Sequence, residues 1–196
     1  MDVTYKPRKK RRKDLAMTTV EYLATPETVL PAELAYGIMR VADAPTVRHQ
    51  RMVGELFKAL DAHVAAHGLG EVLLAPTDVI LDYDRALVVQ PDLLFVARER
   101  DDIVSDCVHG APDLVVEVLS PHPRIGTLNE RIGWFAQYGV RECWLADLRE
   151  LRHTILLLGP RGVVSRQVCE GGRVAPSSVL PGITLPPFRA WSAERR

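Results

Sequence analysis

Two acidic residues stand inside apolar runs of this sequence, and this pattern constrains the fold more than any other. Asp92 lies within LVVQPDLLFV (residues 87–96), and Glu117 lies within DLVVEVL (residues 113–119). Near-continuous runs of Val and Leu are typical of strands that are buried on both faces of a sheet. A carboxylate in such a strand is costly unless it is paired, hydrogen-bonded or bound to a metal. The sequence therefore predicts a sheet that holds an acidic site in its interior.

The rest of the chain predicts helices alternating with strands, an α/β arrangement around a mixed sheet. The long helix carries apolar residues at helical spacing, and Gly68 follows it as a natural C-cap. The expected helices cover residues 19–25, 45–67 and 128–138, the expected strands cover 33–42, 71–81, 87–96, 113–119, 142–147, 152–158 and 162–169, and the Pro-rich tail at 174–196 is expected to be irregular.

Strand geometry indicates what the two acids could do together. Side chains alternate along a strand, so neighbouring strands could point Asp92 and Glu117 to one face about 5 Å apart. That spacing suits two hard oxygen ligands on one Mg²⁺ (or Mn²⁺) ion. The alternative is that each acid pairs with a nearby arginine.

Other candidate residues have simpler explanations. Asp113 belongs to a second Pro-Asp dipeptide, but it lies about 13 Å from Glu117 along one strand and cannot share an ion with it. We interpret Asp113 as an acid at the start of a strand. His49, on the core side of the long helix, either lines the site or is a structural histidine. His63 and His67 stand at the C-terminal end of that helix, where cationic side chains are favourable.

The net charge of zero is unevenly distributed. Residues 6–13 (KPRKKRRK) carry seven of the 25 Lys and Arg residues, and residues 14–196 hold 18 basic and 24 acidic residues, a net charge of −6. We expect residues 1–16 to be a disordered basic arm and residues 17–196 to be one domain. The arm could grip phosphates, act as a targeting tag or simply aid solubility.

Several classes of protein are disfavoured. No apolar stretch approaches the roughly 20 residues of a membrane helix, so we expect no membrane partner. The three cysteines form no CxxC pair, which argues against a zinc ribbon and fits a reduced, cytoplasmic setting. The sequence also has no GxSxG elbow, Walker A loop or HExxH motif.

Taken together, several segments resemble the Uma2 family, a bacterial family of the PD-(D/E)XK nuclease superfamily, over residues 18–188. These segments are VEYLATPE, RHQRMVGEL, VVQPDLLFV, PDLVVEVLSP, GVRECWLAD and LPGITL. The resemblance implies a restriction-endonuclease-like fold, in which a mixed β-sheet core is flanked by helices, with additional C-terminal strands. It also implies that Asp92 and Glu117 are the motif acids, and that Glu33 in AELAYG is a third carboxylate near the metal.

The sequence departs from this family pattern at the motif lysine. In the superfamily, the motif lysine stands two residues after the second motif acid, and this position is Leu119 here. In Uma2-like proteins the lysine lies instead on the following helix, and the matching residue here is Arg131. One helical turn before Arg131, where the family pattern usually has an acid, this sequence has Thr127. Arg131 lies on the apolar side of its helix and could reach the carboxylates. Because arginine stays charged, it could stabilise developing charge but could not act as a base.

These features support three hypotheses. The first is a metal-dependent endonuclease that hydrolyses DNA phosphodiester bonds with Asp92, Glu117, Glu33 and Arg131. The second is a catalytically degenerate nuclease fold that binds nucleic acid or a protein partner without cleavage. The third is a structural protein with no nucleic-acid role, which the net charge of −6 favours. Nucleases of this class often dimerise to cut both strands, so a homodimer is one expectation, although the sequence contains no recognisable dimer interface.

Overall fold

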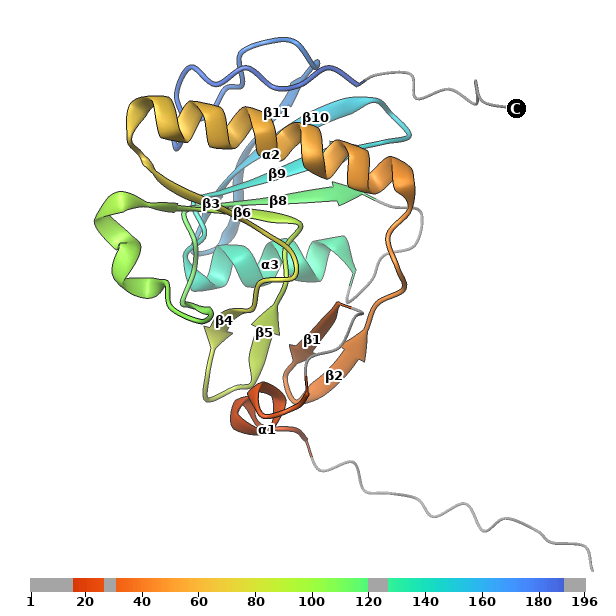
Figure 1. Ribbon diagram of the computed structural model, residues 1–196, viewed down its shortest axis with the longest axis vertical. Helices are drawn as coiled ribbons and strands as arrows, with labels where there is room; N and C mark the ends of the chain where they lie inside the picture. Colours follow the sequence, from red (N-terminus) through yellow and green to blue (C-terminus); the bar gives the residue numbers. More distant parts are fainter. Residues whose placement is uncertain (1–15, 27–30, 120–126, 189–196) are drawn as a thin grey trace, which may run out of the picture.

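A computed structural model of the chain describes residues 16–26, 31–119 and 127–188. The expected basic arm, apart from Ala16, and the end of the C-terminal tail lie outside the described residues. Within them, the strands form a six-stranded and a five-stranded sheet (Figure 1). The mixed α/β architecture predicted from the sequence is confirmed.

The six-stranded sheet forms the centre of the fold. Its order is β11-β10-β9-β8-β6-β3, and β8 and β9 run parallel whereas the other neighbours run antiparallel. α3 (Leu128–Tyr138) connects the parallel pair, as parallel strands require a crossover. The strands are β3 (Gly70–Leu74), β6 (Leu93–Ala97), β8 (Leu114–Leu119), β9 (Glu142–Asp147), β10 (Arg152–Gly159) and β11 (Gly162–Cys169).

Helices cover both faces of this sheet, which explains its near-continuous apolar strands. α2 (Val47–His67) lies on one face, and α3 lies on the other (Figure 1). Thr46 caps the start of α2, and Gly68 ends it in the left-handed conformation, as its sequence predicts. α2 buries a stripe of Met52, Val53, Leu56, Leu60 and Val64.

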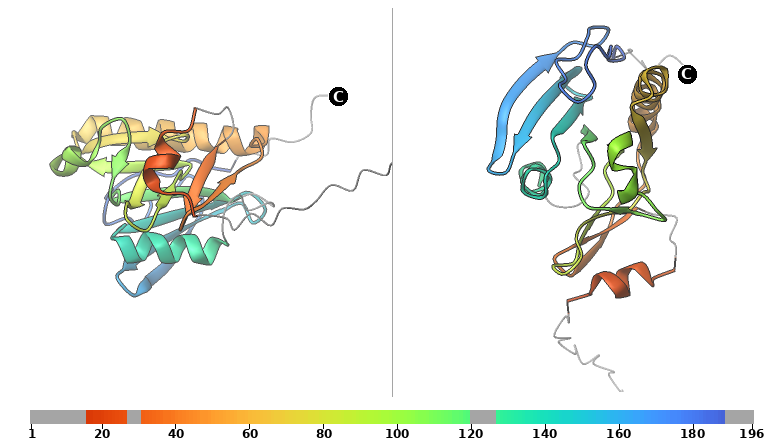
Figure 2. Two further views of the ribbon diagram at one scale, coloured as in Figure 1. Left: turned by 90° about the horizontal axis from the view of Figure 1, so that it is seen from below. Right: turned by 90° about the vertical axis from the view of Figure 1, so that its left-hand side faces the viewer.

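The five-stranded sheet lies on the α3 side, together with the short helix α1 (Thr19–Leu23) (Figures 1 and 2). Its order is β2-β1-β5-β4-β7. A short 3₁₀ segment, η1 (Arg98–Ile103), follows β6, and the sequence does not predict it. The strands are β1 (Ala32–Ala35), β2 (Ile38–Val41), β4 (Val79–Asp82), β5 (Leu87–Val89) and β7 (Val108–His109).

Three predicted strands are each two strands in the structure. Residues 33–42 form the β1–β2 hairpin, because Tyr36 and Gly37 adopt positive φ angles that turn the chain. Residues 71–81 divide between β3 and β4, and residues 87–96 divide between β5 and β6. Pro91 has no N–H to donate, so the ladder is interrupted beside it. Asp92 consequently lies at the entry to β6 rather than within a strand.

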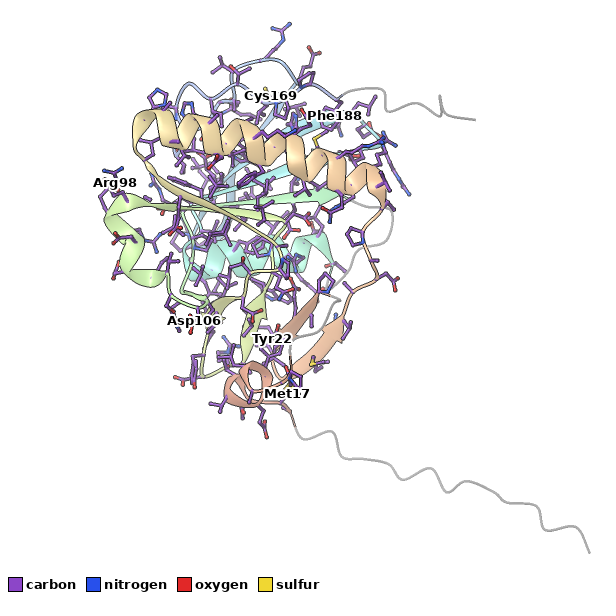
Figure 3. All side chains as sticks on the ribbon, in the orientation of Figure 1. Met17, Tyr22, Arg98, Asp106, Cys169 and Phe188 are labelled. Carbon is purple, nitrogen blue, oxygen red and sulfur yellow. The ribbon has the colours of Figure 1, made fainter. Side chains whose placement is uncertain are left out.

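The C-terminal segment is irregular as far as it is described, yet it is well packed. Leu180, Ile183 and Leu185 are buried with α2 and the central sheet. Nε2 of His153 on β10 lies 3.0 Å from the Pro186 carbonyl oxygen, within hydrogen-bond distance, and the His153 ring lies against Phe188. Because the carbonyl can only accept, the ring Nε2 is the donor. Figure 3 shows Phe188 and Cys169 on this side of the molecule.

Candidate active site

The pairing of β6 with β8 brings the two predicted acids together. Leu93 is the partner of Val116 in this antiparallel register, so Asp92, just before β6, lies beside Glu117 of β8. The condition for a shared site, that these two segments are neighbours, is therefore met. Asp92 is only 7% exposed, and Glu117 is partly buried.

Two contacts at one of its oxygens help to hold the Asp92 carboxylate. Oδ2 accepts a hydrogen bond from the backbone N–H of Val118 at 2.8 Å, and Nε2 of His49 lies 3.2 Å from the same atom. His49 is buried at the start of α2, where its own N–H is capped by Thr46. The structure thus places His49 against the acidic pair, and β6, β8 and α2 together fix the orientation of the Asp92 carboxylate.

Glu33 and Arg131 complete the cluster. Glu33, on β1, is 4% exposed, and its two oxygens have separate partners. Oε1 accepts from the backbone N–H of Gln90 at 2.6 Å, and Oε2 accepts from Nη1 of Arg131 at 2.6 Å. Both oxygens of Glu33 are therefore engaged by the protein.

Arg131 also binds Glu117. Its Nη2 and Nε donate to Oε1 of Glu117 at 2.5 and 3.0 Å. Its guanidinium carbon lies 5.6 Å from the centre of the Phe135 ring, one turn further along α3. Thr127, where the family pattern has an acid, caps α3 in a capping box with Glu130, so the helix that presents Arg131 has a defined start. The alternative considered for Asp92 and Glu117, that each pairs with a nearby arginine, is realised in the structure for Glu117.

Among the described residues, the cluster brings together three carboxylates, the Arg131 guanidinium and the His49 imidazole. Burial raises the pKa of Glu117 to about 7; Arg131 counteracts this rise, and the charges of Asp92 and Glu33 add to it. Burial alone would lower the pKa of Arg131, but Glu117 and Glu33 raise it above its ordinary value, so Arg131 stays charged. The charges of the three carboxylates thus act on one another, and Arg131 offsets part of this repulsion.

The chemistry of these residues is compatible with a divalent cation that Asp92 and Glu117 could hold. Carboxylate oxygens are the donors that Mg²⁺ and Mn²⁺ prefer. The contacts of Arg131 with Glu117 all end on Oε1, so none of them engages Oε2. Glu33 could bind an ion only by giving up Gln90 or Arg131. Within residues 16–26, 31–119 and 127–188, no group of three or more His, Cys, Asp or Glu side chains is arranged to hold a metal ion.

Two further buried acids lie apart from this cluster. Asp113, at the start of β8, accepts from the Ala97 N–H at 2.9 Å, and its other oxygen lies 3.2 Å from Nη1 of Arg100. Glu142, on β9, was not singled out from the sequence, although it too is an acid in an apolar run. It accepts hydrogen bonds from the indole of Trp144 and from Ser177, Ser178 and Val179 of the C-terminal segment.

Comparison with known proteins agrees with this architecture. A family model described as "Uma2: Putative restriction endonuclease" matches residues 19–187. The chain belongs to the Uma2 family. A sequence comparison with curated proteins finds no match.

The fold is also that of a solved relative. The crystal structure of a protein titled "putative nuclease belonging to DUF820", from Anabaena variabilis ATCC 29413, superposes with a TM-score of 0.70. The two share 20% sequence identity, and the match covers 87% of this chain and 94% of that one. The Uma2 assignment and the fold thus agree on a nuclease-like protein with a restriction-endonuclease-like architecture. No helix of the described residues is long and apolar enough to span a membrane.

Proposed function

We propose that this Uma2 protein is a metal-dependent nuclease that hydrolyses phosphodiester bonds in DNA. The observation that carries the proposal is the placement of Asp92, at the entry to β6, beside Glu117 of the neighbouring strand β8, in a buried cluster of three carboxylates. Family membership and fold support the same class of activity. Mg²⁺ or Mn²⁺, when bound, would supply an activated water and neutralise charge on the phosphate.

Each residue of the cluster has a distinct role in this proposal. Asp92 and Glu117 would hold the ion, and His49 would keep the Asp92 carboxylate in place. Arg131 has five N–H donors and uses three of them on Glu33 and Glu117, which leaves two for a phosphate oxygen. Because it cannot lose its proton, it would stabilise negative charge in the transition state rather than act as a base. Glu33 would position Arg131.

A cleavage assay tests the proposal directly. The purified chain is incubated with supercoiled, linear duplex and single-stranded DNA in Mg²⁺, in Mn²⁺ and in EDTA. We expect cleavage that requires the metal and is lost in Asp92→Asn and Glu117→Gln, whereas Asp101→Asn, an exposed acid on η1, serves as the matched control and retains it. Cleavage that survives both Asp92→Asn and Glu117→Gln would exclude this site.

A degenerate nuclease that binds DNA without cutting it is the second candidate. It is favoured by Leu119 and Arg131, which occupy the two positions expected for the motif lysine. It predicts salt-dependent DNA binding with no cleavage in any metal. Cleavage restored by Arg131→Lys would indicate that the substitution at this position is what silenced the site. DNA as the substrate, a homodimer and a cytoplasmic location remain predictions.

A further inference from the structure

A cluster of aromatic side chains and one arginine lies beside the acidic site, and we call it the aromatic–arginine cluster. It consists of Tyr36 from the β1–β2 turn, Arg85 from the β4–β5 turn, and Trp134 and Tyr138 from α3. The Tyr36 and Trp134 rings meet edge to face, with centroids 6.0 Å apart. The guanidinium carbon of Arg85 lies 5.0 Å from the Tyr36 ring centre, and its Nη1 is 3.5 Å from the Tyr138 hydroxyl.

The backbone of Tyr36 adopts a conformation that is unusual for an aromatic residue. Its φ angle is +49°, and that of Gly37 is +83°. Positive φ at both central residues of a two-residue hairpin favours Asn, Asp or Gly, and a bulky aromatic residue there is an outlier. Tyr36 is 37% exposed, so part of the residue faces solvent in this conformation. Backbone strain that the surrounding structure maintains occurs often at ligand-binding sites.

Two residues of the aromatic–arginine cluster follow residues of the acidic site closely along the chain. Tyr36 follows Glu33 by three residues on the same hairpin, a distance of about 10 Å along an extended chain. Trp134 follows Arg131 by three residues on α3, and residues at this spacing are neighbours on a helix surface. A strand with a phosphate at the carboxylates would therefore carry its adjacent nucleotides past Tyr36.

We propose that the aromatic–arginine cluster stacks unpaired bases of the nucleic-acid strand whose phosphate lies at Asp92 and Glu117. The inference rests on the proposed function and specifies its substrate as a strand with unpaired bases. Aromatic rings and guanidinium planes stack on the faces of bases of any sequence, and these faces are hidden inside a duplex. Arg85 brings a guanidinium plane beside the rings, next to the Asp82 carboxylate that accepts a hydrogen bond from the Tyr138 hydroxyl at 2.8 Å.

The turn itself provides a sharp test. Tyr36→Asn removes the ring and installs a residue that the turn prefers, so binding and folding should respond differently. Tyr36→Phe keeps the ring. Tyr83→Asn removes the neighbouring turn's tyrosine, which is 51% exposed and lies outside the cluster, and is the matched control. Binding is measured by fluorescence anisotropy with a labelled oligothymidine of about 12 nucleotides in EDTA, and folding is measured by thermal melting.

We expect Tyr36→Asn to raise the Kd about 5- to 100-fold, the range for loss of one stacked base, with an unchanged or raised melting temperature. Tyr36→Phe and Tyr83→Asn should bind like the wild type. The proposal fails if the wild type does not bind the oligothymidine, if Tyr36→Asn binds it equally well, or if Tyr36→Asn weakens binding only together with folding. A change in oligomeric state in Tyr36→Asn would instead make the cluster a protein interface and also overturn it.

Measuring oligothymidine binding in EDTA, separately from cleavage in metal, tests this inference independently of the proposed function. Tyr36-dependent binding without cleavage in any metal would leave the stacking surface in place and exclude catalysis. Metal-dependent cleavage with binding that is indifferent to Tyr36 would support the nuclease and exclude the stacking surface.

Discussion

Arg131 on α3 donates to Glu33 on β1 at 2.6 Å, although the two residues are 98 positions apart in the sequence. The same guanidinium binds Glu117 on β8. One buried cation thus connects the five-stranded sheet to the six-stranded sheet at the candidate site. The residue that would stabilise a phosphate is therefore also a structural element of the fold, and the two roles call for separate measurements.

Removing the Arg131 guanidinium should destabilise the protein strongly. Arg131→Met leaves two buried carboxylates without their cation, so we expect the free energy of unfolding to fall by about 3–5 kcal/mol. Urea denaturation followed by circular dichroism measures this. The matched control is Arg152→Met, whose exposed side chain lies 3.9 Å from Glu150 and should contribute less than about 1 kcal/mol. Equal effects of the two substitutions would show that Arg131 does not stabilise the cluster.

The raised pKa of Glu117 predicts a pH dependence of stability. Between its unfolded value of 4.5 and its folded value of about 7, the folded state binds more protons at this carboxyl than the unfolded state does. The stability that this protonation provides is complete below 4.5 and is lost as the pH rises through about 7. Urea midpoints in EDTA at several pH values should therefore fall more steeply with pH in the wild type than in Glu117→Gln. Parallel profiles would contradict the assignment.

The sequence predicts the strand partners and the acids better than it predicts where strands end. The apolar runs around Asp92 and Glu117 identify adjacent buried strands, because a central sheet covered by helices on both faces needs such runs. The division of residues 87–96 into two strands at Pro91 is not predicted, because the apolar residues continue on both sides of the proline although it lacks an N–H donor. Arg131 could be placed on the inner side of its helix, but its contact with Glu33 depends on a hairpin from another sheet, which no local pattern encodes.

Glu142 should be structural and independent of the candidate site. Its carboxylate receives hydrogen bonds from Ser177, Ser178 and Val179 and so fixes the C-terminal segment against β9. In Glu142→Ala these donors lose their shared acceptor, and we expect a loss of about 2–4 kcal/mol in the free energy of unfolding. Limited proteolysis should also cleave the segment near residue 178 sooner. Exposed Glu150→Ala is the control, and resistance to proteolysis equal to the wild type would refute the role.

The two Pro-Asp dipeptides should respond in opposite ways to the same substitution. Asp113 neutralises Arg100 and accepts the Ala97 N–H, so Asp113→Asn should lower the free energy of unfolding by about 1–3 kcal/mol and leave Mn²⁺ affinity unchanged.

Asp92→Asn can keep an oxygen on the Val118 N–H and relieves repulsion with Glu117, so its stability should change little. Its Mn²⁺ affinity should fall at least about tenfold, because an amide is a weaker ligand than a carboxylate. Isothermal titration calorimetry with Mn²⁺ and urea denaturation of both variants measure the two quantities. If Asp113→Asn rather than Asp92→Asn abolishes Mn²⁺ binding, the metal site lies at the start of β8 and the pairing of Asp92 with Glu117 serves only the fold.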